Sequence, residues 1–215
     1  LAAAVAPAAC DEATVAERRA AAAADSSADV VIAAAWPWRS RGEFHFGEGL
    51  DLAVDEVNRA GGIGGRRLRL LRVDDLESVD EGRLVAQRLG DSASVVAVIG
   101  HLQSYVTVPA STIYGQAGLL HFAPVSTDPA LTSQGFDRIF RGTFTHDVVG
   151  ARMAELSAGR GYRRMGVYYV RNPYGRGLAN AFEERANALG VVVAARESYE
   201  PTDDTSGQPF AHTLG

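Results

Sequence analysis

Residues 30–35 read VVIAAA, residues 49–60 read GLDLAVDEVNRA and residues 68–73 read LRLLRV, with the turn GGIGG at 61–65 between the last two runs. The first and third runs have the composition of strands, and in the second an apolar residue recurs every three or four positions, as on one face of a helix. A strand, a helix and a strand in this order indicate a βαβ unit with parallel strands. This stretch therefore predicts an α/β fold.

The same alternation continues along the chain. Further strands are predicted at 95–99, 119–123 and 138–141, with helices over 79–89 and 104–116 between them. Parallel strands joined by helices form a sheet that is covered on both faces. Residues 29–145 are therefore predicted to form one complete ligand-binding lobe.

A second α/β unit starts near residue 146. A helix is predicted over 147–158, then a strand at 165–170, a helix over 174–189 and a strand at 191–198. Two strands and one pair of helices make a thin core, which is marginal on its own. Residues 146–215 are therefore interpreted as part of a second lobe, and the natural protein is expected to be longer than this chain.

The first 28 residues differ in composition from the rest. They are rich in alanine, and a run of small apolar residues at 1–9 precedes Cys10, the one cysteine of the chain. One interpretation is the end of a secretory signal with a lipoprotein site, in which Cys10 would carry the lipid. The other is an alanine-rich leader with an incidental cysteine. In both, residues 1–28 are a leader and tether, and ordered structure is expected from Asp29.

Composition and motifs disfavour several classes of protein. The net charge is −5 and no long basic tract is present, which disfavours a nucleic-acid partner. No apolar run approaches the roughly 18 residues that a membrane-spanning helix needs. The five histidines show no HExxH spacing and no GxSxG motif is present, so neither a metal site nor a catalytic set is predicted.

The glycines at 61–65 suggest a phosphate-binding loop by composition only. Such loops follow a strand and open a helix, whereas these glycines close a helix and lead into a strand. They are interpreted as a helix stop and a tight turn. The loop after the first strand, residues 36–42, has no GxGxxG. No nucleotide cofactor is therefore expected, and the chain is not predicted to be an enzyme.

Two polar segments follow the carboxyl ends of predicted parallel strands, where open α/β sheets bind ligands. Residues 100–104 read GHLQS and residues 124–129 read PVSTDP. A serine at the start of a helix offers a hydroxyl beside free backbone N–H groups, and the helix dipole attracts a carboxylate. Taken singly, Ser104 could be a plain N-cap, and Thr127 with Asp128 a turn with a side-chain hydrogen bond.

Five motifs together resemble the leucine/isoleucine/valine-binding proteins of bacterial ABC importers. They are the run at 49–65, the pair at 74–75, GHLQS at 100–104, FAPVSTDPALT at 122–132 and NPYGRGLA at 172–179, in the order and spacing of that family. The resemblance implies a type I periplasmic-binding fold, in which two Rossmann-like lobes close over a ligand. It also implies an extracytoplasmic protein, periplasmic or lipid-anchored, that captures an amino acid or similar small carboxylate for an ABC permease.

The resemblance assigns roles to residues of the two polar segments. Ser104 would bind the ligand carboxylate through its hydroxyl and backbone. Val125 would offer its carbonyl to the ligand ammonium, and Thr127 would contribute hydroxyl and backbone contacts. These three residues would hold the part of the ligand that all amino acids share.

Other residues would surround the ligand side chain. Tyr174 of the second lobe would close over the ligand, and Leu102 and Gln103 would border the side-chain pocket; the polar Gln103 leaves the preference for aliphatic ligands open. The aromatic residues of the first loop are candidates either for this pocket or for packing at the lobe edge; they are Trp36, Trp38, Phe44 and Phe46. A ligand-sensing domain of a receptor or regulator with the same fold is the alternative function.

Overall fold

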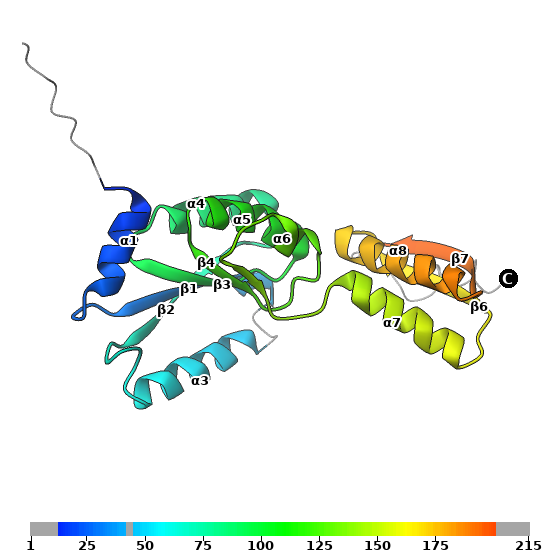
Figure 1. Ribbon diagram of the computed structural model, residues 1–215, viewed down its shortest axis with the longest axis horizontal. Coiled ribbons are helices and arrows are strands. Elements are labelled where there is room, and N and C mark those ends of the chain that lie inside the picture. Colours follow the sequence, from blue (N-terminus) through cyan, green and yellow to red (C-terminus); the bar gives the residue numbers. More distant parts are fainter. Residues whose placement is uncertain (1–12, 42–44, 201–215) are drawn as a thin grey trace, which may run out of the picture.

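The computed structural model describes residues 13–41 and 45–200, which form two α/β lobes in succession along the chain (Figure 1). In the first lobe the elements are α1 (Val15–Ala24), β1 (Val30–Trp36), α2 (Trp38–Arg41), α3 (Phe46–Arg59), β2 (Leu68–Asp74), α4 (Val79–Gly90), β3 (Val95–Gly100), α5 (Ser104–Gln116), β4 (Leu120–Ala123), α6 (Ala130–Ser133) and β5 (Ile139–Arg141). In the second lobe they are α7 (His146–Gly159), β6 (Arg164–Val170), α8 (Pro173–Ala188) and β7 (Val192–Tyr199).

The sheet of the first lobe contains five parallel strands in the order β2-β1-β3-β4-β5. The chain runs outward from β1 to β2 and then returns to add β3 on the other side of β1. This reversal is the topological switch point of open α/β sheets, at which ligands bind beyond the carboxyl ends of the strands. The predicted α/β fold with parallel strands is confirmed, and each predicted strand of this sheet differs from the observed one by one residue at one end.

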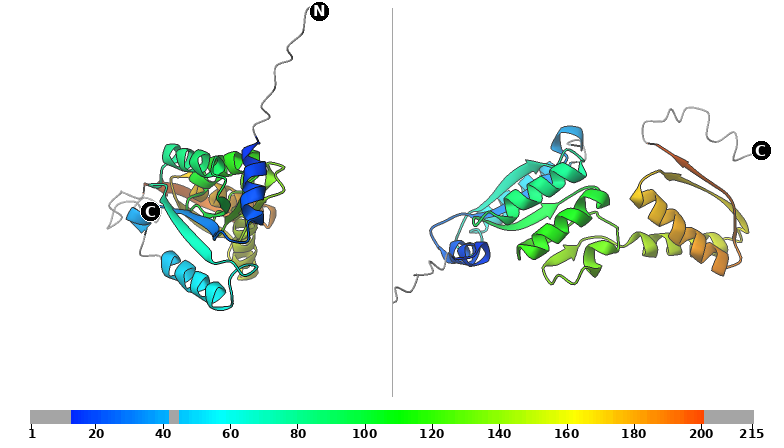
Figure 2. Two further views of the ribbon diagram at one scale, coloured as in Figure 1. Left: turned by 90° about the vertical axis from the view of Figure 1, so that its left-hand side faces the viewer. Right: turned by 90° about the horizontal axis from the view of Figure 1, so that it is seen from above.

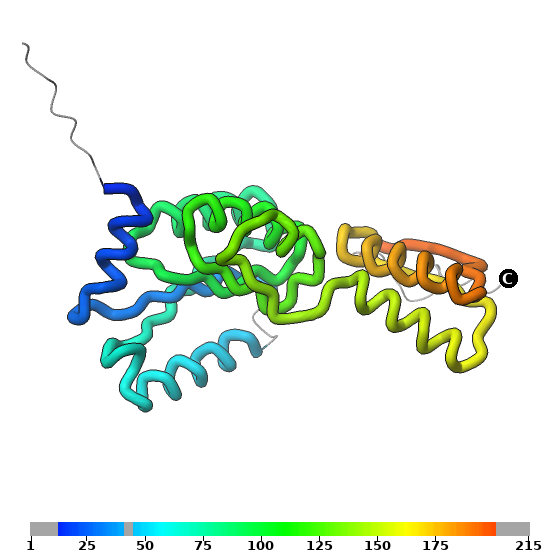
Figure 3. Tube along the Cα trace, viewed as in Figure 1, coloured from blue at the N-terminus to red at the C-terminus, as the bar shows by residue number. Residues whose placement is uncertain are grey.

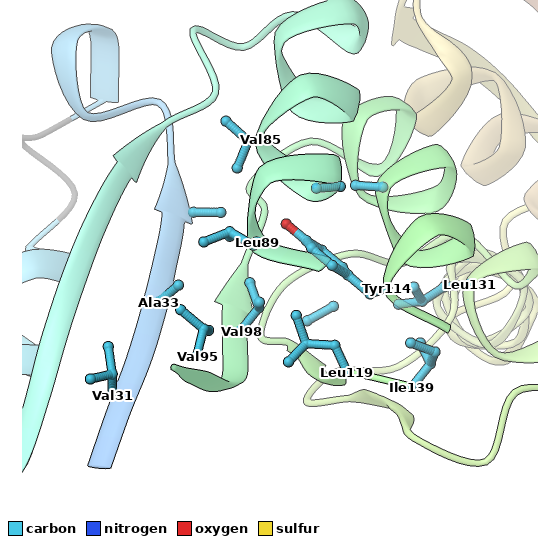
Figure 4. Close-up of a cluster of buried hydrophobic side chains, with 14 residues drawn as sticks. Val31, Ala33, Val85, Leu89, Val95, Val98, Tyr114, Leu119, Leu131 and Ile139 are labelled. Atoms are coloured by element: carbon cyan, nitrogen blue, oxygen red, sulfur yellow. The ribbon is translucent and has the colours of Figure 1, made fainter. Parts of the chain in front are cut away.

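Helices cover the two faces of this sheet unequally. Helices α4 and α5 lie against one face, and α3 lies on the other (Figures 1 and 2). The core is built from α4, α5 and the strands beneath them, where the side chains of Val85, Leu89, Val98, Tyr114 and Leu119 are buried (Figure 4). The apolar runs that predicted the strands therefore supply the core of the lobe.

The glycine cluster at 61–65 closes α3, as predicted. The Gly62 N–H donates to the Val57 carbonyl at 2.9 Å, and the backbone there adopts a positive φ of 76°. A Cβ at Gly62 would lie 1.9 Å from the Arg66 carbonyl oxygen. Since only glycine fits this conformation in so little space, the segment is a helix stop and turn.

A short helix, α1, lies in the segment that the sequence assigned to a tether. Thr14 and Glu17 form a capping box at its start. The guanidinium of Arg19 is buried and donates to the carbonyls of Gly90 at 2.6 Å and Ala117 at 2.8 Å, where α4 and α5 end. The expectation that ordered structure begins at Asp29 is wrong, because this long-range contact docks α1 on the first lobe. Cys10 lies outside the described residues.

The second lobe has a parallel two-stranded sheet, β6 with β7, and two helices that pack on each other. It follows the first lobe after a single passage of chain between β5 and α7 (Figure 3). Its cluster of buried side chains contains Ala154, Phe182, Ala186 and Val191. This core is thin, as the sequence predicted. None of the helices in the described ranges has the length and apolar character required to cross a membrane.

Candidate ligand-binding site

The two polar segments lie side by side at one edge of the first sheet. Residues 101–103 connect β3 to α5, and residues 124–129 follow β4. Because β3 and β4 are parallel neighbours, both loops leave the sheet at the same edge. Figure 1 places the beginnings of α7 and α8 next to this edge. The two polar segments therefore lie where the two lobes meet.

Ser104 links the two loops. It is 5% exposed, and its Oγ accepts a hydrogen bond from Ser126 Oγ at 3.1 Å and from the Thr127 N–H at 3.3 Å. Gln103 occupies the N-cap position, so the interpretation of Ser104 as a plain N-cap is wrong. Both bonds are donated to Ser104, so its own hydroxyl proton takes part in neither of them. That proton can be donated to a ligand at the positive end of the α5 dipole.

Thr127 places a second hydroxyl at this point. Its Oγ1 is buried and has no hydrogen-bond partner within the described ranges, and the same is true of His146 Nδ1. The Thr127 carbonyl accepts from the His146 N–H at 2.9 Å, which ties the first lobe to the first residue of α7. A buried unpaired polar group costs about 1–3 kcal/mol, so a ligand that pairs with it gains that energy. Asp128, by contrast, forms the turn that the sequence suggested, with its Oδ1 accepting from the Ala130 N–H at 2.9 Å.

Arg141 of β5 holds the loop at 124–129 in place. Its guanidinium donates to the Ser126 carbonyl at 2.8 Å and to Thr132 Oγ1 at 2.9 Å. Partial burial lowers the pKa of Arg141 from its usual range, and the group remains a cation at neutral pH. Val125 is 44% exposed, and in the described part of the chain its carbonyl accepts no hydrogen bond. That carbonyl is available to a ligand ammonium.

Gln103 makes a contact that the sequence did not indicate. Its Nε2 donates to Glu77 Oε1 at 2.6 Å, across the loops that follow β2 and β3. The two residues are far apart in the sequence, and no local pattern links them. The amide of Gln103 is therefore occupied by a carboxylate of the protein. Leu102 beside it is half-buried, and the place of both residues at the ligand side chain stays a prediction.

Tyr174 is the second residue of α8 and is 41% exposed. Asn172 caps this helix, with its Oδ1 accepting from the Gly175 N–H at 2.9 Å. Tyr174 also lines an apolar, solvent-open pocket of about 410 Å³ on the second lobe, together with Met153, Leu156, Val170, Leu178 and Phe182. Neither Ser104 nor Thr127 lines that pocket, so it is separate from the hydroxyl groups at the start of α5.

Three of the four aromatic residues of the first loop pack together, and Phe44 lies outside the described residues. The ring centroid of Phe46 lies 4.1 Å from that of Trp36 and 5.9 Å from that of Trp38. Trp36 is only 3% exposed, and Trp38 Nε1 donates to the Val73 carbonyl at 3.1 Å. Of the two alternatives for this loop, these contacts favour packing at the lobe edge. The described residues contain no group of three or more acidic, histidine or cysteine side chains that could hold a metal ion.

Comparison with known proteins matches most of the chain to one family. The model of the family described as periplasmic binding protein matches residues 45–212. An amino acid binding protein of Pseudomonas aeruginosa is 35% identical over 173 residues, covering 76% of this chain and 45% of the relative. A Leu/Ile/Val-binding protein homolog of Brucella abortus is 34% identical over 145 residues, which are 67% of this chain and 39% of that protein.

A solved structure is similar as well. The ABC transporter substrate-binding protein of Desulfitobacterium hafniense, in complex with Leu, superposes with a TM-score of 0.74 at 41% sequence identity. The match covers 80% of this chain and 51% of that protein. The chain thus spans about half the length of the proteins it matches.

Proposed function

Since this chain belongs to the periplasmic binding protein family, we propose that it contributes one lobe and part of a second to a protein that captures an amino acid by lobe closure. The α-carboxylate lies at the start of α5, held by the Ser104 hydroxyl, by backbone N–H groups and by Thr127. The α-ammonium lies at the Val125 carbonyl. Tyr174 closes over the ligand from the second lobe, and the ligand leaves chemically unchanged.

The observation that carries this proposal is the buried Thr127 hydroxyl, which has no hydrogen-bond partner among the described residues. It lies next to a Ser104 hydroxyl whose own proton is not used in the bonds from Ser126 and Thr127. A hydrogen bond to a charged group contributes about 1.5–3 kcal/mol, and a micromolar complex requires about −8 kcal/mol in total. Two such bonds at the carboxylate, a third at the ammonium and the buried ligand side chain supply energies of this order.

A branched aliphatic side chain is the ligand class that we propose. Relatives of this chain bear the name Leu/Ile/Val-binding protein homolog, and the Desulfitobacterium hafniense protein was solved with leucine. The polar Gln103 is compatible with an aliphatic ligand, because its Nε2 donates to Glu77 rather than facing the ligand without a partner. Leu102 at the same loop presents an apolar side chain to the ligand.

We further propose that the ligand is delivered to an ABC permease and that the protein lies outside the cytoplasm; membership of the family supports both. The alanine-rich leader with Cys10 fits a secreted protein that is held at the membrane by a lipid. Mass spectrometry of protein isolated from membranes would detect the acylated peptide that begins at Cys10.

The test is calorimetry of the full-length protein with leucine, isoleucine and valine, and with two truncated analogues. The analogue 4-methylpentanoate lacks the ammonium and 3-methylbutylamine lacks the carboxylate. We expect leucine to bind in the micromolar range or tighter, and each analogue to bind at least tenfold more weakly, because every lost charged hydrogen bond removes about 1.5–3 kcal/mol. Equal binding of leucine and the amine would contradict a carboxylate at Ser104.

The 215-residue chain by itself is expected to bind leucine weakly or undetectably. Among its described residues, the Val125 carbonyl is the one group that we propose for the ammonium, and its second lobe has a two-stranded sheet. The same calorimetric titration, run on this chain and on the full-length protein, measures the difference. Equal micromolar affinity in both would show that these 215 residues supply the whole site.

A further inference from the structure

A chain of buried polar side chains lies directly under the loop that leads to Ser104. It consists of Asp75, the residue after β2, His101, the residue after β3, and Tyr114 of α5, with exposed fractions of 1%, 0% and 0%. Buried polar groups of this kind are retained when each has a hydrogen-bond partner. None of the three is part of the proposed ligand contacts.

The hydrogen-bond distances among these three side chains indicate which nitrogen of His101 carries the proton. His101 Nδ1 lies 2.6 Å from Asp75 Oδ2, and His101 Nε2 lies 3.1 Å from the Tyr114 hydroxyl. Burial, aided by the Asp75 carboxylate, raises the pKa of Tyr114, so the hydroxyl keeps its proton. His101 is the one partner of that hydroxyl among the described residues. The hydroxyl therefore donates to Nε2, and Nδ1–H donates to the carboxylate.

The opposite arrangement leaves a donor unsatisfied. If His101 carried its proton on Nε2, the Tyr114 hydroxyl would accept that proton and would have no acceptor for its own. Nδ1 would then face the Asp75 carboxylate lone pair to lone pair. A doubly protonated His101 ring would also donate from Nε2 to Tyr114 and leave the Tyr114 hydroxyl proton without an acceptor.

Further hydrogen bonds connect Asp75 and His101 to the loop at 101–103 from neighbouring elements. Asp75 Oδ1 accepts from the Glu77 N–H at 2.9 Å, and the Glu77 side chain binds Gln103, the residue before Ser104. On the other side, His121 of β4 lies 2.6 Å through Nε2 from the Gly100 carbonyl. Burial lowers the pKa of His121 to about 3, so that ring is neutral and acts as the donor.

We propose that Asp75, acting through His101, is a positioning residue for ligand binding: the Nδ1–H tautomer of His101, held between Asp75 and Tyr114, fixes the loop at 101–103 and thereby the hydroxyl of Ser104. The inference rests on the proposed function for its effect on affinity. The proton arrangement itself does not depend on which ligand binds. The alignment matters because a hydroxyl that is displaced or mobile loses its hydrogen bond to a carboxylate.

The first experiment is nitrogen-15 NMR of the histidine rings of the full-length protein at neutral pH without ligand. The signals of His101 are assigned by their loss in His101→Gln. We expect the chemical shifts and one-bond couplings of a neutral ring protonated at Nδ1. A ring protonated at Nε2, or at both nitrogens, overturns the proposal.

The second experiment compares Asp75→Asn with two control variants in leucine calorimetry and thermal unfolding. Asparagine can serve only one of the two N–H donors that Asp75 accepts, so we expect leucine affinity to fall at least tenfold. Asp74→Asn removes the neighbouring carboxylate, which binds the Arg39 and Leu76 N–H groups, and should stay within twofold of the wild type. Val85→Ala opens a cavity in the core and should lower thermal stability while leaving affinity within twofold.

Three outcomes of the second experiment are decisive. A tenfold loss confined to Asp75→Asn supports positioning. An Asp75→Asn protein that binds as the wild type overturns it, and so does an equal loss in Val85→Ala, since the effect would then follow stability. If Asp75→Asn does not fold, the tautomer of the wild-type protein decides. If the wild type binds no amino acid, the proposed function fails, and the tautomer still tests the proton arrangement.

Discussion

Ser104→Ala is expected to weaken leucine binding by the full-length protein about 10- to 150-fold, since a hydrogen bond to a charged group contributes about 1.5–3 kcal/mol. The substitution removes the donor to the carboxylate. It also removes the acceptor that joins Ser126 and Thr127 to the start of α5, at 3.1 Å and 3.3 Å. Calorimetric titration measures the loss.

The matched control is Ser111→Ala in the same helix. Ser111 is 0% exposed, and its Oγ donates to the Val108 carbonyl at 2.7 Å, away from the two loops. Both substitutions delete a buried hydroxyl from α5, but only Ser104 is placed at the ligand. We expect Ser111→Ala to keep wild-type affinity. Wild-type affinity in Ser104→Ala, or an equal loss in both variants, would remove Ser104 from the proposed site.

Gly150→Ala is expected to have the largest effect on stability, by separating α7 from α8. A Cβ at residue 150 would lie 2.7 Å from the Phe182 backbone nitrogen and 2.8 Å from the Leu178 carbonyl oxygen. Backbone atoms inside a packed helix cannot move aside, and such overpacking typically costs 1–3 kcal/mol, occasionally more. Because the core of this lobe is thin, we expect amide hydrogen exchange in α7 and α8 of the full-length protein to accelerate at least tenfold.

Gly159→Ala is the control for this prediction. Gly159 lies at the end of the same helix, and a Cβ there would meet nothing within 4 Å. Alanine has a higher helix propensity than glycine by up to about 1 kcal/mol, so this variant should be as protected as the wild type or more so. Unchanged exchange in Gly150→Ala would mean that the two helices have room to separate without cost.

The positions of the main strands and helices could be predicted from the sequence because their signals are local. An apolar run such as 30–35 needs burial on both sides wherever it lies, and the glycines at 61–62 stop a helix through their own backbone conformation. The placement of Ser104 and Thr127 at one edge also followed, because parallel strands end on the same side of a sheet.

Helix α1 and the contacts of Gln103 could not be predicted in the same way. The alanine-rich run at 15–24 has no apolar face that marks it as a docked helix, and its position depends on Arg19 reaching carbonyls at Gly90 and Ala117. The sequence indicates Gln103 only as a polar residue at the predicted pocket, whereas in the structure its amide donates to Glu77. Both contacts join residues far apart in the sequence, and propensity carries no information about such pairs.

The sequence alone determined the α/β class, the order of the elements and which two loops meet at the sheet edge, because hydrophobic period and turn chemistry act over a few neighbouring residues. Only the tertiary structure decided that Asp75, His101 and Tyr114 form one buried chain under the loop before Ser104. The physical reason is burial: a carboxylate, an imidazole and a phenol are stable without water only when folding brings each to the partner that it needs.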